Sequence, residues 1–142
     1  MKRIVIDAST LLSGLGGHPH GPSATLLNAV YDHIVEAVAC PTLIEQVQRG
    51  LAKPYFQARL SEQKPPEAII AIETATVMLA DPIEPETVLR DPTDDYLVAL
   101  ARTASAELIV TGDKDLLEHI GLQPPAISAR NACELLGLIE LT

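Results

Sequence analysis

The chain has 142 residues, of which 47% are hydrophobic and 20% charged, which is typical of one globular domain with a sizeable core and excludes a disordered protein. Its net charge of −9 argues against binding of nucleic acid through basic residues alone, and its 3% aromatic content argues against a stacking surface for bases. No stretch has the length of a membrane span or the pattern of a signal peptide, so we expect a cytoplasmic protein with no membrane contact, whose Cys40 and Cys133 are reduced core thiols.

The first half of the chain alternates short apolar runs with segments of helical periodicity. Residues 3–7 predict a central parallel strand that is buried on both faces and closed by Asp7. A turn or short helix follows, and then a loop rich in Gly, Pro and His, which is a candidate lip over a substrate site. The next predicted elements are a helix over 23–33, a strand over 35–40 and helices over 42–52 and 55–62.

The second half of the chain continues this alternation. A helix is predicted over 66–79, whereas the proline-rich residues 80–86 can form at most a brief edge strand. The next helix is expected to begin with Asp91 as its N-cap and Pro92 in its first turn. The remaining elements are a strand over 107–113, a short helix over 114–119, a brief strand over 125–128 and a helix over 129–137. This order predicts an α/β fold with a mostly parallel sheet, in a single domain that spans residues 1–142.

Several carboxylates are expected to gather at one edge of the sheet. Asp7 and Asp113 each follow the C-terminal end of a strand, which is where open parallel sheets bind their ligands. Asp95 stands beside the apolar run of its helix, at a position where helix capping requires no acid. Glu45 is a fourth candidate, although taken alone it is more simply interpreted as half of an ion pair with Arg49 on a solvated helix face.

A group of carboxylates at one point requires a compensating positive charge, because like charges repel and lose hydration. Mg²⁺ binds a few carboxylates together with waters and substrate phosphates. A divalent ion can also activate water for attack on a phosphodiester. A metal site would therefore explain how a chain with a net charge of −9 acts on a nucleic acid.

Four segments of the chain resemble, in order and spacing, the four motifs of the PIN-domain family. They are IVIDAST at 4–10, TLIEQV at 42–47, DPTDDYLVALA at 91–101 and LIVTGDKDLL at 108–117. The resemblance covers essentially the whole chain and is strongest to the branch of VapC-like toxins of bacterial toxin–antitoxin pairs. It implies a three-layer α/β/α sandwich and a Mg²⁺- or Mn²⁺-dependent ribonuclease that cleaves single-stranded RNA.

The resemblance also implies roles for individual residues. The catalytic, metal-binding acids would be Asp7, Glu45, Asp95 and Asp113. The residues expected to support these ligands are Ser9, Asp94, Thr111 and Asp115. Of these, Asp94 is also the alternative to Asp95 as the direct ligand, because both lie at the mouth of the same helix.

Basic residues near Glu45 are candidates for binding the substrate. Arg49 and Lys53 follow it at helical spacing and could guide RNA, although ordinary surface charge explains them equally well. The resemblance further implies a small antitoxin protein as partner and a homodimer or higher homo-oligomer.

Two other functions fit parts of the pattern. One is a catalytically inactive PIN-like module that binds RNA or protein, against which the presence of all four acids counts. The other is a metal-dependent phosphatase of small phosphate esters, which is disfavoured because Asp7-Ala8-Ser9 supplies no second aspartate after the first strand.

Overall fold

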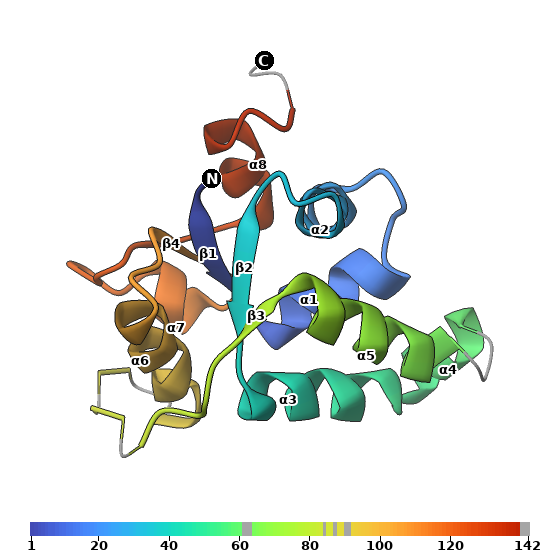
Figure 1. Ribbon diagram of the computed structural model, residues 1–142, viewed down its shortest axis with the longest axis horizontal. Helices are drawn as coiled ribbons and strands as arrows, with labels where there is room; N and C mark the ends of the chain where they lie inside the picture. Colours follow the sequence, from blue (N-terminus) through green and yellow to red (C-terminus); the bar gives the residue numbers. More distant parts are fainter. Residues whose placement is uncertain (61–63, 84, 87, 90–91, 140–142) are drawn as a thin grey trace.

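Five parallel strands form the central sheet of the computed structural model, which describes residues 1–60, 64–83, 85–86, 88–89 and 92–139 (Figure 1). The strand order is β3-β2-β1-β4-β5. Their bounds are β1 Arg3–Ile6, β2 Glu36–Ala39, β3 Val77–Met78, β4 Leu108–Val110 and β5 Ala126–Ile127. Every pairing within this sheet is parallel, so the predicted α/β class with a mostly parallel sheet is confirmed.

Strand β1 lies at the centre of the sheet, between β2 and β4. Ile4 pairs with Ala37 on one side and with Leu108 on the other. Val5 and Ile109 have no solvent exposure, which is why these strands are apolar along their whole length rather than at alternate positions. The predicted burial of both faces is therefore confirmed for the central strands.

Helices cover both faces of the sheet and complete three layers. On one side α6 packs against β1, β2 and β4, and α7 contacts β5, whereas α1, α2 and α5 lie on the other side (Figure 1). Helix α3 packs against α1 and α5, and α8 against α2. The helices are α1 Ala8–Gly16, α2 Pro22–Tyr31, α3 Pro41–Leu51, α4 Pro54–Arg59, α5 Lys64–Ala75, α6 Asp95–Thr103, α7 Lys114–Leu117 and α8 Ala129–Leu135. None of the helices in the described part of the chain is long and apolar enough to cross a membrane.

Several element boundaries differ from the sequence-based prediction, and two of these differences change the type of structure that forms. The helix expected over 66–79 ends at Ala75, and Val77–Met78 form the edge strand that the sequence placed no earlier than residue 80. The helix expected from Asp91 begins instead with a 3₁₀ turn over Pro92–Asp94, and α6 starts at Asp95. Asp91 itself, the expected N-cap, lies outside the described residues.

A glycine allows α1 and α3 to pack closely at the C-terminal edge of the sheet. A Cβ atom on Gly50 would lie 2.3 Å from Cδ1 of Leu12, so a larger residue would push the two helices apart or displace the Leu12 side chain. This close packing brings the polar face of α3 opposite the residues that follow β1.

Both Cys40 and Cys133 are free and buried, as predicted.

Candidate functional site

A groove of about 540 Å³ opens at the C-terminal edge of the sheet, between α1, α3 and the beginning of α6. Besides the Ser9 hydroxyl, its polar lining consists of carboxylates from the sheet edge and the turn before α6, and of an amide and two cations from α3 and the residues just after it. They are Asp7, Asp94 and Asp113 on the one hand, and Gln46, Arg49 and Lys53 on the other. The groove therefore has an acidic side and a side that offers hydrogen-bond donors.

Asp7 is held in one orientation by hydrogen bonds to both carboxylate oxygens. It is the N-cap of α1, where its Oδ1 accepts from the backbone N–H of Thr10 at 2.8 Å. The Ser9 hydroxyl lies 3.2 Å from each carboxylate oxygen, and the Thr111 hydroxyl donates to Oδ2. With only 6% of its surface exposed, Asp7 is a nearly buried acid with a fixed geometry.

Thr111 links the first acid to the last. Its hydroxyl oxygen donates to Asp7 and accepts from the backbone N–H of Asp113 at 3.0 Å. Asp113 is in turn the N-cap of α7, where its Oδ1 accepts from the backbone N–H of Asp115 at 2.9 Å. The ends of β1 and β4 are thus joined by a continuous chain of hydrogen bonds, as the positions of Ser9 and Thr111 in the sequence suggest.

At the mouth of α6, the structure places Asp94 in the groove and turns Asp95 away from it. Asp95 is 3% exposed, and its Oδ1 accepts from the backbone N–H groups of Val88 at 3.1 Å and Leu89 at 2.8 Å. The physical reason is the 3₁₀ turn over Pro92–Asp94, which has about 3.0 residues per turn instead of 3.6 and so changes the direction of the following side chains. Asp95, expected at the site, instead stabilises the backbone of the preceding segment.

A similar difference of one residue occurs on α3. Gln46 lines the groove, whereas the Glu45 side chain is 57% exposed and forms an ion pair with Arg49. Val47 and Leu51 point into the core, and the flank of α3 that faces α1 carries Gly50 and, four residues earlier, Gln46. The sequence therefore offers an amide, and not a carboxylate, at this position of the groove.

Tyr96 supports Gln46 from the core side, a contact that the sequence analysis did not identify. Its hydroxyl donates to Oε1 of Gln46 at 2.5 Å. Burial raises the pKa of Tyr96 above its usual value, and the carboxylates of Asp94, Asp7 and Asp81 add to this effect. Tyrosine is protonated at neutral pH even without this shift, and the hydroxyl is a donor in this contact.

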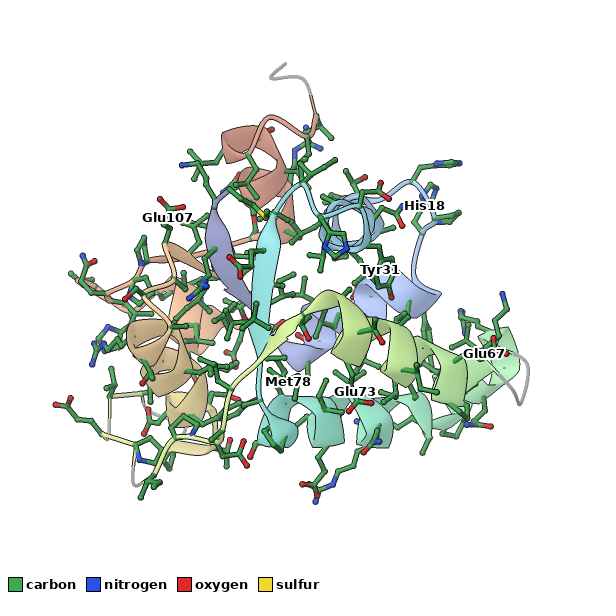
Figure 2. All side chains as sticks on the ribbon, viewed as in Figure 1. His18, Tyr31, Glu67, Glu73, Met78 and Glu107 are labelled. Atoms are coloured by element: carbon green, nitrogen blue, oxygen red, sulfur yellow. The ribbon has the colours of Figure 1, made fainter. Side chains whose placement is uncertain are left out.

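The loop histidines lie elsewhere. His18 extends from the loop between α1 and α2, on the side of the molecule occupied by α2 (Figure 2). Neither His18 nor His20 is among the described residues that line the groove, so the expected lip over the site is not observed.

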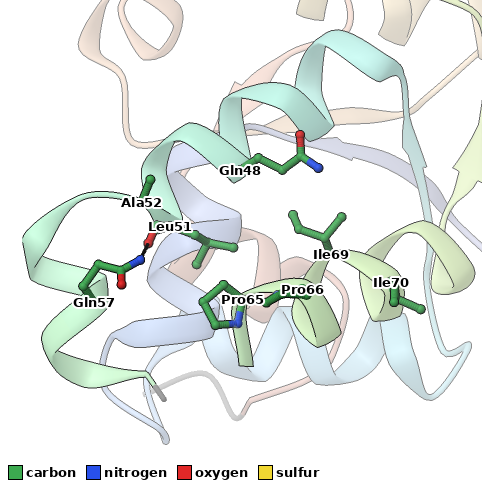
Figure 3. Close-up of a pocket in the computed structure, with 8 residues that line it drawn as sticks. All are labelled: Gln48, Leu51, Ala52, Gln57, Pro65, Pro66, Ile69 and Ile70. Atoms are coloured by element: carbon green, nitrogen blue, oxygen red, sulfur yellow. Dashed lines mark hydrogen bonds between the residues drawn. The ribbon is translucent and has the colours of Figure 1, made fainter. Parts of the chain in front are cut away.

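A second cavity, of about 480 Å³, lies on the opposite side of α3 (Figure 3). Gln48, Leu51 and Ile69 are among its lining residues, and Gln57 closes one end by donating to the carbonyl of Leu51 at 2.9 Å. No carboxylate, imidazole or amine of the described residues lines this cavity.

The acids of the groove do not form a complete ligand set by themselves. Within the described residues, no three His, Cys, Asp or Glu side chains are close enough together to hold a metal ion. An ion in the groove would therefore need water or substrate oxygens in addition to the protein.

A three-layer fold with carboxylates beyond the ends of β1 and β4 is the arrangement of α/β proteins, which commonly bind ligands at the C-terminal edge of the sheet. Residues 3–115 match the family model of the PIN domain, and the chain belongs to this family, whose members are generally nucleases that use divalent metal ions. No curated protein matches the sequence.

Two solved structures share the fold. PAE2754 from Pyrobaculum aerophilum has a TM-score of 0.64 and 17% sequence identity, and the match covers 97% of this chain and 91% of that protein. FitAcB from Neisseria gonorrhoeae has a TM-score of 0.53 and 14% identity, with 89% of this chain and 98% of that chain covered. At these identities the likeness establishes the common fold.

Proposed function

We propose that the protein is a metal-dependent endoribonuclease that cleaves single-stranded RNA. The observation that carries this proposal is the groove at the C-terminal edge, where Asp7, Asp94 and Asp113 face Arg49 and Lys53. Acids on one side suit a divalent cation, and cations on the other suit the phosphates of a nucleic acid. Membership of the PIN-domain family supports the same assignment.

Mg²⁺ or Mn²⁺ fits the oxygen-rich character of the acidic side. Mg²⁺ typically keeps several waters and binds through one or two carboxylates together with substrate phosphates, so three preformed ligands are not required. When bound, such an ion would lower the pKa of a water molecule and neutralise charge on the phosphate. Asp7 and Asp113 are the best-prepared ligands, because hydrogen bonds already fix both carboxylates.

We assign the third acid to Asp94 and give no metal-binding role to Asp95 or Glu45. Asp94 lines the groove, whereas Asp95 is committed to two backbone N–H groups and Glu45 to Arg49 at the surface. In this assignment Ser9 and Thr111 orient Asp7, Asp115 orients Asp113 through its backbone N–H, and Arg49 and Lys53 bind RNA.

The family resemblance supports a role as the toxin of a toxin–antitoxin pair. In that role the cytoplasmic enzyme would be restrained by a small antitoxin protein and would act as a homodimer or higher homo-oligomer. Co-expression with the product of an adjacent small open reading frame tests this, because a true antitoxin would relieve growth arrest and would co-purify with the chain.

A second function, an inactive PIN-like module that binds RNA or protein, is favoured by one observation. The groove carries the neutral Gln46 where the sequence analysis expected an acid, which reduces the negative charge available to a metal. Such a module would bind RNA without cleaving it.

Cleavage of labelled single-stranded RNA in Mg²⁺, Mn²⁺ or EDTA tests the proposed enzyme. We expect metal-dependent cutting that falls at least about a hundredfold in Asp7→Asn and in Asp94→Asn, because each loses a charged ligand. Asp95→Asn should retain most of the activity. Activity of Asp94→Asn with loss in Asp95→Asn would reverse our assignment, and binding without cleavage by the wild type would favour the inactive module.

A further inference from the structure

The side of the groove formed by α3 presents donors to whatever binds there. Gln46 and Arg49 are three residues apart and so lie on one face of α3, and Lys53, the N-cap residue of α4, lines the groove beside them. Arg49 is paired with Glu45, but both side chains are largely exposed, so this pair holds the guanidinium only weakly. Lys53 forms no ion pair with any described residue.

Gln46 differs from the two cations because its orientation is fixed. The Tyr96 hydroxyl donates to Oε1, so the oxygen of the amide is turned towards the core. The amide nitrogen lies at the other end of the same planar group. It forms no hydrogen bond with a described residue. Because Gln46 lines the groove, its N–H₂ group is the end available to a ligand.

The contact between Tyr96 and Gln46 is protected from solvent. Tyr96 is only 7% exposed, so water does not compete for the hydrogen bond that its hydroxyl donates to Gln46. A glutamate in place of Gln46 would also accept this bond, but it would then present an anion instead of an N–H₂ group to the groove.

We propose that Gln46 donates through its amide N–H₂ group to a phosphate oxygen of bound RNA, and that Tyr96 is a positioning residue that orients this amide. The proposal rests on the proposed ribonuclease function for the identity of the ligand. It divides the groove into a metal-binding side, made of carboxylates, and a phosphate-binding side on α3. Gln46 is thereby a substrate-binding residue and not a substitute metal ligand.

This division predicts opposite effects of one substitution on two ligands. Gln46→Glu should weaken binding of RNA about tenfold, because a donor to phosphate becomes an anion beside it. The same change should strengthen binding of Mn²⁺ several-fold, because it adds a carboxylate to the acidic groove. Gln46→Ala should weaken RNA binding by a smaller factor, about three- to fivefold, and leave Mn²⁺ binding unchanged.

Two direct binding measurements test these expectations without relying on catalysis. Fluorescence anisotropy of a short labelled single-stranded RNA in EDTA reports RNA affinity, and isothermal titration calorimetry with MnCl₂ reports metal affinity. Gln48→Glu is the matched control, since it makes the same chemical change two residues away on α3, where the side chain lines the opposite cavity (Figure 3). We expect it to change either affinity by less than about twofold.

The role of Tyr96 is tested by a double-mutant cycle. If Tyr96 acts through the amide, Tyr96→Phe weakens RNA binding in the wild type but has no additional effect in Gln46→Ala. Additive effects of the two substitutions would instead show that Tyr96 influences the groove through packing, and would overturn this part of the proposal.

The outcomes separate this proposal from the proposed function. The proposal for Gln46 is overturned if Gln46→Glu binds RNA as tightly as the wild type. It is also overturned if Gln46→Glu loses affinity for both RNA and Mn²⁺, which would indicate a structural role for Gln46. If the wild-type protein cleaves RNA with Mn²⁺ but does not bind RNA in EDTA, the proposed nuclease function is supported and the proposed phosphate-binding side is contradicted. If the protein binds RNA in a way that depends on Gln46 but does not cleave it, the phosphate-binding role of Gln46 is supported and the proposed nuclease function is contradicted.

Discussion

Asp95 is a buried carboxylate that stabilises the backbone of residues 88–89. We expect Asp95→Ala to lower the free energy of unfolding by about 2–3 kcal/mol, because it leaves two backbone N–H groups without an acceptor in a largely buried place. Asp95→Asn keeps an acceptor oxygen and should lose about 1 kcal/mol. Urea unfolding at neutral pH measures both values.

Asp94→Asn is the natural comparison, since it changes the neighbouring acid in the same way. It should destabilise the fold less than Asp95→Ala while reducing Mn²⁺ affinity more. If Asp95→Ala were as stable as the wild type and failed to bind Mn²⁺, Asp95 would belong to the metal site and not to the backbone contact.

The sequence predicts that Asp7 and Asp113 lie close together. It does not predict which of two adjacent polar residues lines the groove, Asp94 or Asp95 at the start of α6 and Glu45 or Gln46 on α3. Two apolar runs that each end near an aspartate imply that the two acids share one edge of a parallel sheet. At the mouth of α6, residues 95–98 are all buried, so helical periodicity does not show which acid points into the groove. On α3, the resemblance selected Glu45 because it is an acid, although Gln46 lies on the flank that faces α1.

At the scale of elements, the N-terminus of α3 depends on a residue from another part of the chain. Cys40, at the N-cap position, provides no capping hydrogen bond from its side chain, and the backbone N–H of Thr42 donates instead to Oδ1 of Asp81 at 2.8 Å. Asp81 follows β3, so this contact joins the edge of the sheet to the helix that carries Gln46 and Arg49. Its pKa is lowered, chiefly by the hydrogen bond from the Thr42 backbone.

Removing this cap should have a small effect that depends on pH. Because the pKa of Asp81 is lower in the folded protein, its stabilising contribution is present above the unfolded pKa of about 3.9 and is lost as pH falls through the folded pKa. Asp81→Ala should therefore lower the free energy of unfolding by about 0.5 kcal/mol at pH 7, a small value because Asp81 is exposed to water, and by less in acid.

Urea unfolding at pH 7 and at several values below pH 4 measures the difference. Asp81→Asn is the control, since an asparagine can accept the same bond and does not titrate. An effect of Asp81→Ala that is equally large in acid would show that the charge of Asp81 does not contribute to the cap.

The alternation of strands and helices was predictable, whereas the ends of elements near prolines and β-branched residues were not. Helical periodicity continues from residue 66 through Val77, but the chain leaves the helix at Thr76, whose hydroxyl donates to the carbonyl of Ile72 at 2.8 Å. Val77 then pairs with Val38, so the sheet determines a boundary that local pattern leaves open.

For the whole molecule, the net charge of −9 and the few cations of the groove together determine how RNA binding responds to salt. Each phosphate contacted on a single strand contributes about −0.7 to the slope of log K against log salt concentration. If Arg49 and Lys53 supply the contacts, the slope should be about −1.4 in EDTA, and Arg49→Gln should reduce its magnitude by about 0.7. Anisotropy titrations between about 50 and 200 mM KCl measure this slope. A slope steeper than about −2.1 would mean three or more contacted phosphates, which is more than the two cations of the groove can supply, and would place part of the RNA outside the groove.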